Sequence, residues 1–281
     1  MMKTKPIHNP RLLIAMLLCL APLFACVAPP IGTPTSTATL TPLPPVPTAI
    51  AEPPDTGWQM FPNGIEVRNI SVAAEVGVER LTLVRLAPQA FTFHVAYTPG
   101  SARLVSEWAR QTQAQVVING GYFTEELLTT GLIVSQGQRY GVSYGDFAGM
   151  FAIKDGVVSL RWLREWPYDP NEALQEALQS FPVLVKPGGV MGFPADADDG
   201  RIARRSVIAQ DRQGRLLFIS APRGYLSLHA LAVWLTDSDL EIDIALNLDG
   251  GTSTGLWVAG ELREVQIDSF TAVPSVITVG P

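Results

Sequence analysis

The amino-acid sequence predicts an α+β domain with mixed β-sheets and a few helices. Two observations lead to this fold class. Residues 80–86 and 90–97 alternate apolar and polar side chains with the period of two that is typical of half-buried strands. Short strand-like segments recur through residues 58–281, and they outnumber the segments that have helical spacing.

The next expected elements follow in chain order. Apolar residues between 104 and 109 fall on one face of a helix, just before an apolar strand that ends at Asn119. Residues 150–160 contain two apolar runs separated by a glycine-containing turn, which predicts a hairpin. Residues 171–179 have helical spacing and are therefore expected to form a helix.

The C-terminal part of the domain is expected to follow the same pattern. Residues 206–220 again consist of two apolar runs with a glycine turn between them, and are expected to form a hairpin. Residues 227–236 are expected to form a helix, with Ser227 as the N-cap. An acidic loop then leads into an apolar strand that ends at Asn247.

The N-terminus has the layout of an export signal. Three cationic residues precede a largely apolar stretch at residues 12–25, which is too short to indicate a membrane-spanning helix. The segment that ends in Cys26, Leu-Phe-Ala-Cys, resembles a bacterial lipobox, in which the cysteine is lipidated and becomes the first mature residue. The alternatives are an ordinary signal peptide cleaved nearby and an uncleaved anchor. We expect residues 1–25 to be a lipoprotein signal peptide, and the protein to be lipid-anchored through Cys26 on the extracytoplasmic side of a bacterial envelope.

Two further regions follow the signal. Residues 26–57 are rich in proline and threonine and are expected to form an extended tether, because this composition cannot bury a core. Residues 58–281 are long enough for one sizeable domain. That domain contains no cysteine, so we expect neither a disulfide nor a cysteine-ligated metal in it.

Charge and motifs argue against several classes of function. The chain has a formal net charge of −6, and removal of residues 1–25 takes away three positive charges and no negative ones, which makes it −9. An acidic chain without a basic cluster is a poor candidate for nucleic-acid binding. The sequence has neither a phosphate-binding P-loop motif nor a dinucleotide fingerprint, so a nucleotide cofactor is not expected.

Two predicted strands end in closely similar polar sequences. The first runs into Asn119-Gly120-Gly121-Tyr122-Phe123, and the second into Asn247-Leu248-Asp249-Gly250-Gly251-Thr252-Ser253-Thr254. Paired glycines permit turns that expose backbone N–H groups, and polar residues at strand ends are typical of binding sites. The two strand ends are therefore expected to face each other across one cleft. The alternative is that both are only tight, hydrogen-bonded turns.

At these residues the chain resembles the phosphodiester glycosidase domain family. Members include the lysosomal enzyme that uncovers mannose-6-phosphate, and bacterial envelope proteins, some of them exopolysaccharide-related. The matching segments are residues 118–123, 130–134, 205–209 and 247–254, in the family's order. Together they span most of the region between residues 115 and 279. The resemblance implies a phosphodiester-glycosidase-like fold and cleavage of the bond between a sugar's anomeric carbon and a phosphate oxygen.

Residue chemistry and the matching positions together suggest roles. Asp249 is the candidate catalytic carboxylate, as base, nucleophile or oxocarbenium stabiliser, and Arg205 is the candidate phosphate clamp. Further substrate contacts are expected from the backbone amides of Gly120, Gly121, Gly250 and Gly251, from Asn119 and Asn247 toward sugar hydroxyls, and from Ser253 and Thr254. For a second catalytic carboxylate, Glu125 and Asp146 rank equally. Thr124 occupies a position where many relatives carry aspartate, which weakens the case for an acid or a metal there.

Other motifs yield weaker or rejected readings. Residues 251–255 fit the Gly-x-Ser-x-Gly pattern of serine hydrolases. We reject a serine hydrolase, because every histidine lies upstream of Ser253 and because a strand, not the helix of that motif, is expected to follow. The aspartates between residues 196 and 199 lack calcium-loop spacing, and no metal or other cofactor is expected, although casual Ca²⁺ binding there stays open. Aromatic residues between 162 and 168 either form a wall for stacking sugars or close the core under a loop.

The combined expectation is an envelope-tethered hydrolase that cleaves a sugar-1-phosphate diester in envelope or extracellular glycans. Its partners would be a phosphoglycan or sugar-phosphate substrate and, through Cys26, the membrane. The alternative is a surface lipoprotein that binds carbohydrate without catalysis. Replacement of Asp249 by asparagine separates the two, because a binding protein keeps its affinity and an enzyme loses turnover.

Overall fold

The computed structural model describes residues 53–61, 64–260 and 264–281, which belong to one compact unit at residues 50–281. The predicted signal peptide at residues 1–25, the predicted lipidation site Cys26 and most of the predicted tether at residues 26–57 lie outside the described residues. Within the described ranges, no helix is both long enough and apolar enough to span a membrane.

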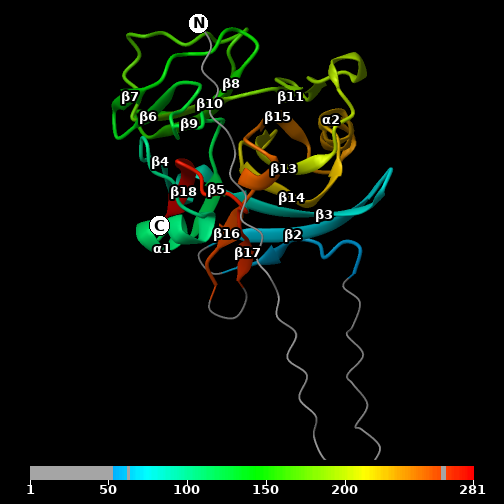
Figure 1. Cartoon of the computed structure of the whole chain (residues 1–281). Helices are drawn as coiled ribbons and strands as arrows, with labels where there is room; N and C mark the ends of the chain where they lie inside the picture. Colours follow the sequence, from blue (N-terminus) through cyan, green and yellow to red (C-terminus); the bar gives the residue numbers. More distant parts are fainter. Residues whose placement is uncertain (1–52, 62–63, 261–263) are drawn as a thin grey trace, which may run out of the picture. The chain divides into compact units, whose positions relative to one another are not determined.

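The strands of the described chain form three sheets (Figure 1). In spatial order, the first contains β1 (Gln59–Met60), β2 (Glu66–Ala74), β3 (Gly77–Leu86), β14 (Leu216–Leu226), β13 (Ala203–Asp211), β15 (Ile242–Asn247), β11 (Val183–Lys186) and β12 (Val190–Met191). The second contains β7 (Gln138–Tyr140), β6 (Ile133–Ser135), β10 (Glu176–Ser180), β8 (Gly149–Lys154) and β9 (Val157–Trp162). The third contains β17 (Val265–Ile267), β16 (Leu256–Val258), β5 (Val116–Asn119), β18 (Ser275–Gly280) and β4 (Thr92–Tyr97).

The predicted α+β class is confirmed. Each strand pair in the described residues is antiparallel. The α-helices of this part of the chain are α1 (Val105–Thr112) and α2 (Leu228–Asp237). Helix α1 packs on the third sheet, and α2 packs on the first.

Most of the predicted local elements are present. The hairpin expected at residues 150–160 is formed by β8 and β9, and the one at 206–220 by β13 and β14. The predicted cap of α2 is also confirmed, because the Ala230 N–H donates to Ser227 Oγ at 3.2 Å. These elements depend on turn and cap residues that act within a few positions, which makes them predictable from local sequence.

The helix predicted at residues 171–179 is wrong. Residues Glu176–Ser180 form β10, which pairs with β8 on one side and β6 on the other. All five residues of this strand are buried. Glu176 and Gln179 are polar but buried, and both accept hydrogen bonds within the protein. Polar residues in this strand therefore do not mark a solvent-exposed face, the sequence lacks the alternation that identifies half-buried strands, and tertiary packing overrides the local pattern.

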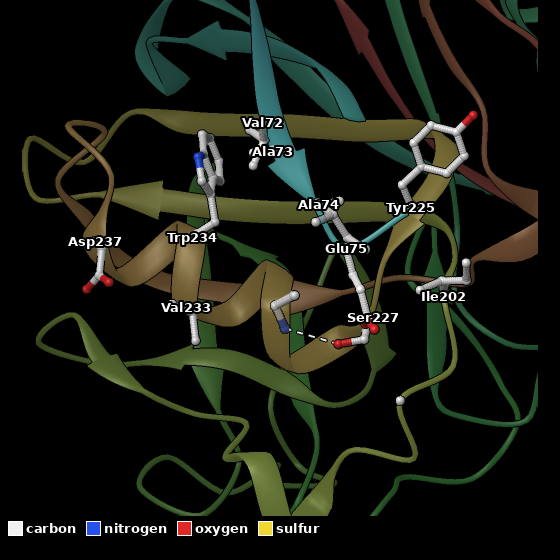
Figure 2. A pocket seen from close by; sticks show the side chains of 13 residues that line it. Val72, Ala73, Ala74, Glu75, Ile202, Tyr225, Ser227, Val233, Trp234 and Asp237 are labelled. Atoms are coloured by element: carbon white, nitrogen blue, oxygen red, sulfur yellow. Dashed lines mark hydrogen bonds between the residues drawn. The ribbon is translucent and has the colours of Figure 1, made fainter. Parts of the chain in front are cut away.

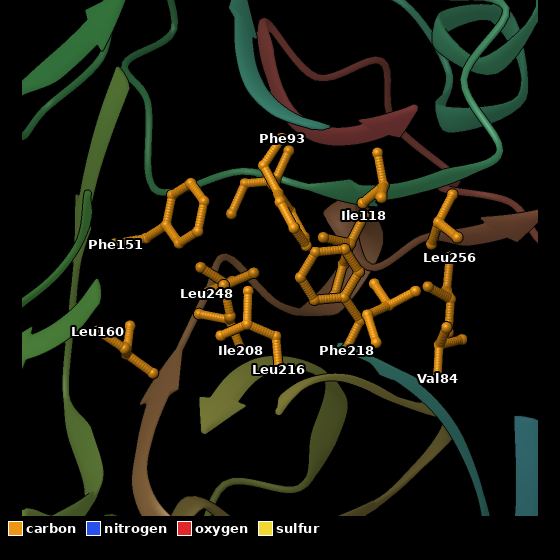
Figure 3. Packing of buried hydrophobic residues seen from close by; sticks show 14 of the residues in the cluster. Val84, Phe93, Ile118, Phe151, Leu160, Ile208, Leu216, Phe218, Leu248 and Leu256 are labelled. Carbon is orange, nitrogen blue, oxygen red and sulfur yellow. The ribbon is translucent and has the colours of Figure 1, made fainter. Parts of the chain in front are cut away.

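The largest hydrophobic cluster lies where the three sheets meet (Figure 3). Each sheet contributes residues to this cluster: Phe218 from β14, Phe151 from β8, Phe93 from β4 and Ile118 from β5. Leu248, which directly follows β15, is fully buried in the same cluster. Burial of Leu248 anchors the strand end on which the polar sequence motif lies.

Candidate functional site

The two polar strand ends are in direct contact, although β5 and β15 belong to different sheets. The Asp249 N–H donates to the Gly120 carbonyl oxygen at 3.1 Å. The Asn119 Nδ2 donates to the Asp249 carbonyl oxygen at 2.7 Å. The two motifs thus form one hydrogen-bonded junction between sheets.

Asn119 holds this junction together. Its side chain is fully buried. Its Oδ1 accepts from Ser206 Oγ at 2.6 Å and from the Gly255 N–H at 3.0 Å. Its Nδ2 donates to Gly120 at 3.2 Å as well as to Asp249. A carboxamide has two donors and two acceptor sites, so bonds within the protein use the whole group.

Glycine is required in the turn that follows Asp249. A Cβ atom on Gly250 would lie 2.8 Å from the Arg204 carbonyl oxygen, which is too close for any side chain. Gly251 has a φ of 60°, in the left-handed region that glycine adopts without strain. The paired glycines therefore permit a close approach of backbone and then a left-handed turn.

A cavity of about 280 Å³ opens at this junction. Its lining residues are Tyr122, Asp199, Arg201, Ala203, Arg205, Leu228, Asp249, Gly250 and Gly251. The structure thus brings together four of the predicted site residues: Asp249, Arg205, Gly250 and Gly251. Sequence reasoning missed Tyr122, Asp199 and Arg201 as parts of the site.

Asp249 is the half-buried carboxylate of this cavity. Burial raises the pKa of its carboxyl group, whereas hydrogen bonds from the Ser253 hydroxyl and the Gly250 N–H act in the opposite direction. None of the ion pairs found among the described residues includes Asp249. Its carboxylate is therefore not neutralised by a neighbouring cation.

Arg205 is a buried cation held by carbonyl groups. Only 9% of the residue is exposed. Its Nη2 donates to the Arg201 carbonyl oxygen at 2.5 Å, and its Nε to that of Leu226 at 3.4 Å. Burial lowers the pKa of the guanidinium group, but an arginine stays charged at neutral pH. Arg205 is likewise absent from the ion pairs of the described residues, so its charge is available to an anion.

Tyr122 links Asn247 to the cavity. Its hydroxyl donates to the Phe181 carbonyl oxygen at 3.1 Å and accepts from Asn247 Nδ2 at 2.8 Å. Burial, reinforced by the charge of Asp249, raises the pKa of Tyr122 to about 12, so the phenol is protonated at neutral pH. Asn247 is itself buried, and its Oδ1 has no hydrogen-bond partner among the described residues. The sequence signal for Tyr122 was its place directly after the paired glycines.

The remaining predicted binding residues lie in or beside the junction. The Gly120 N–H donates to the Ser275 carbonyl oxygen at 2.9 Å, so the sheet already uses this amide. Gly121 is buried, and a Cβ atom there would lie 2.8 Å from the Gln179 carbonyl oxygen. Ser253 is buried beside Asp249, and Thr254 is fully buried with no partner for its hydroxyl among the described residues. The roles predicted for these residues toward substrate stay predictions.

The structure does not bring Glu125 or Asp146 to the cavity. Glu125 is exposed. Asp146 is 63% exposed in its side chain and pairs with Arg164 at 3.1 Å. The second carboxylate on the cavity wall is Asp199, from the acidic loop in which the sequence suggested casual Ca²⁺ binding. The described residues contain no cluster of three or more histidine, cysteine, aspartate or glutamate side chains that would hold a metal.

A larger cavity, of about 600 Å³, lies elsewhere, between β2, the end of β14 and α2. Figure 2 shows its mainly apolar wall, with Trp234 and Val233 on α2 and Val72 on β2. It contains none of the residues predicted to act on substrate. The smaller cavity is the candidate site because charged groups converge there.

Comparisons with known proteins agree with this fold. The profile of the phosphodiester glycosidase family matches residues 112–280, which include the whole junction from Asn119 to Thr254. The catalytic domain of zebrafish N-acetylglucosamine-1-phosphodiester α-N-acetylglucosaminidase, auto-inhibited by its pro-peptide, has a TM-score of 0.62 at 19% identity, over 82% of this chain and 84% of that chain. A hypothetical protein from Synechocystis has a TM-score of 0.53 at 18% identity, over 76% of this chain and 62% of that chain. No curated protein sequence matches significantly. At these identities, the structural likeness establishes a shared fold.

Proposed function

The chain belongs to the phosphodiester glycosidase family, and from this premise we propose that it hydrolyses a sugar-1-phosphate diester. One observation carries the proposal. Asp249 and Arg205 lie on the wall of the same small cavity, and neither charge is paired with a neighbouring side chain among the described residues. A glycosyl phosphate diester presents an anion next to an electrophilic anomeric carbon, and so it complements both groups.

In the proposed reaction, the bond between the anomeric carbon and a phosphate oxygen breaks, and the electron pair stays on that oxygen. The leaving group is a phosphate monoester, which needs less protonation than a sugar alkoxide does. Arg205 would bind the phosphate through its free guanidinium donors. Asp249 would either accept a proton from the water that attacks the anomeric carbon, or bond to that carbon as the phosphate leaves, with water then hydrolysing the resulting glycosyl ester and restoring the carboxylate.

The groups around Asp249 suit this role. The raised pKa of its carboxyl group moves a weak base toward the strength that general-base catalysis requires. The Ser253 hydroxyl and the Gly250 N–H fix the orientation of the carboxylate. Asn119 is a positioning residue, because its side chain bonds to the backbone carbonyl of Asp249 and not to the carboxylate.

The proposed setting is the bacterial envelope. The cationic and apolar N-terminus, the lipobox-like sequence at Cys26 and the Pro/Thr-rich tether together support an extracytoplasmic, lipid-anchored protein. A hydrolase so placed would act on envelope or extracellular glycans that contain sugar-1-phosphate diesters. Radiolabelled palmitate would be incorporated by the wild type and not by Cys26→Ser.

The activity is tested with defined diesters. Purified chain would be incubated with methyl N-acetylglucosamine-1-phosphate and with UDP-N-acetylglucosamine, and release of free sugar followed by chromatography. We expect release that falls by about 10²- to 10⁴-fold in Asp249→Asn, the range for loss of a group that acts in the transition state.

Matched controls are Glu125→Gln and Asp146→Asn, which neutralise exposed carboxylates outside the cavity. Both should retain close to full activity. Binding of the diesters without sugar release, unchanged in Asp249→Asn, would instead identify the chain as a non-catalytic carbohydrate-binding protein.

A further inference from the structure

Four aromatic rings form a continuous strip that begins in the candidate site. We call Tyr122, Phe181, Tyr144 and Phe147 the aromatic strip. The ring centroids of Tyr122 and Phe181 are 4.6 Å apart. Phe181 in turn lies 5.2 Å from Tyr144 and 5.5 Å from Phe147, in edge-to-face contacts. These are the distances at which aromatic side chains attract one another, so the strip packs as a unit.

The strip leads from the cavity to solvent. Tyr122 lines the cavity, whereas Phe147, at the other end, is 51% exposed. The charge of Asp249 contributes to the raised pKa of Tyr144, after the larger effect of burial, which places Tyr144 within the field of that carboxylate. The exposed ring of Phe147 therefore provides an apolar surface near the cavity in which Asp249 lies.

The strip is held in place by contacts on several sides. The Tyr144 N–H donates to Gln179 Oε1 at 2.8 Å, and the Tyr144 hydroxyl is hydrogen-bonded to Thr130 Oγ1. Gly131 leaves room for the Tyr144 ring, since a Cβ atom there would lie 2.9 Å from its Cδ2. Tyr144, against which the Phe147 ring packs with centroids 5.8 Å apart, is therefore held in place before any ligand binds, which lowers the entropy lost on binding.

Two arginines line the cavity, together with the carboxylates of Asp199 and Asp249 and one ring of the aromatic strip, Tyr122. Arg205 lies in β13 and Arg201 in the loop before it, both beside the first sheet. Tyr144 and Phe147 precede β8, and Phe181 follows β10, so this part of the strip comes from the second sheet. A ligand that reaches from the arginines of the cavity to the outer rings of the aromatic strip must have an anionic end and an end with apolar faces.

We propose that the aromatic strip is a subsite for the glycosyl side of the substrate, with a pyranose ring stacked on Phe147 while the phosphate faces Arg205. This inference rests on the proposed function. The C–H faces of a pyranose supply the apolar surface that matches an aromatic ring, and its hydroxyls remain in water at the rim. The strip thus selects substrates in which the transferred sugar carries at least one further sugar.

The aromatic residues singled out from the sequence are less suited to this task. Trp166 is exposed, but the Arg161 guanidinium lies over its ring, 4.2 Å from the centroid. Trp162 and Tyr168 pack against hydrophobic core clusters. A cation already occupies one face of Trp166, which makes Trp166→Ala a matched control for removal of an exposed ring.

The test compares substrates that share one leaving group. Steady-state kinetics of the full chain would be measured with methyl phosphodiesters of N-acetylglucosamine and of its β-linked disaccharide. In Phe147→Ala we expect KM for the disaccharide to rise by roughly three- to tenfold, the range for loss of one ring contact, with kcat unchanged. KM for the monosaccharide should rise less, and Trp166→Ala should change neither value.

Three results would overturn the subsite while leaving the proposed function intact. One is turnover of both diesters with identical KM values in the wild type and in Phe147→Ala. Another is a rise of KM in Phe147→Ala that appears only for diesters whose additional sugar is attached to the phosphate, which would assign the aromatic strip to the leaving group. The third is a loss of kcat together with a lower melting temperature, which would show a structural role for Phe147. Failure of the proposed function has a different signature, because the wild type would then release no sugar from either diester.

Discussion

Replacement of Asn119 by alanine should destabilise the protein far more than the loss of one side chain suggests. The change leaves the Gly255 N–H and the Asp249 carbonyl oxygen without their hydrogen-bond partner at a buried junction. The other two partners are less affected, because the Ser206 hydroxyl can rotate and the Gly120 carbonyl still accepts from the Asp249 N–H. Each buried group left unpaired costs about 1–3 kcal/mol, so two such groups give a loss of about 2–6 kcal/mol.

The assay is equilibrium unfolding in urea at neutral pH. Asn171→Ala is the matched control, because the Asn171 amide is exposed and bonds only to nearby Asp169, and its effect should stay within about 0.5 kcal/mol. Asn119→Asp tests the donor of the side chain apart from its acceptor. The variant keeps the acceptor oxygen Oδ1, but it replaces the Nδ2 donor that faces two carbonyl oxygens. A loss below about 1 kcal/mol for Asn119→Ala would refute the assignment of Asn119 as the clamp of the junction.

Two further predictions concern the unpaired charges. Arg205→Gln should lower kcat/KM by roughly 10- to 150-fold, because a hydrogen bond to a charged group contributes about 1.5–3 kcal/mol. Arg212 is exposed and lies outside the cavity, so Arg212→Gln should leave kcat/KM unchanged. Equal losses of kcat/KM in the two variants would contradict the role of Arg205 as a phosphate clamp. Burial raises the pKa of Asp249 above its unfolded value, so ionised Asp249 opposes folding at neutral pH, and this penalty disappears as the pH falls below the unfolded pKa. Asp249→Asn should therefore be more stable than the wild type at pH 7, with the difference narrowing toward pH 4 in urea unfolding; a less stable variant at pH 7 would contradict this.

Local patterns in the sequence were sufficient for much of the fold. Strand alternation, the glycine turns and the Ser227 cap act over a few residues, and the elements they predict are present. The error at β10 has a physical cause, because its polar residues are buried between neighbouring strands and so do not alternate with apolar ones as in a half-buried strand. The sequence also could not show that β5 and β15 belong to different sheets, since strand partners depend on long-range pairing.

The site was predictable only where its residues lie in the two strand motifs or in the matching family segments. Asp249, Arg205 and the paired glycines were found in this way and line the cavity. Asp199 was missed because its acidic loop has no pattern that distinguishes a cavity wall from a solvated turn. Phe181 was missed because it is 59 residues from Tyr122 in the chain, and only tertiary packing brings the two rings together.

The two strand motifs are similar in sequence, but Asn119 and Asn247 have different hydrogen-bonding roles. Asn119 is bonded through both side-chain atoms and fixes the backbone of the junction. Asn247 uses only its donor, toward Tyr122 and the Phe181 carbonyl, and so holds the base of the aromatic strip. Because these neutral amides secure the junction, no ion pair is needed there, and Asp249 and Arg205 stay unpaired within one cavity. Two opposite charges kept apart in this way are complementary to a ligand that is itself both anionic and electrophilic, as a glycosyl phosphate is.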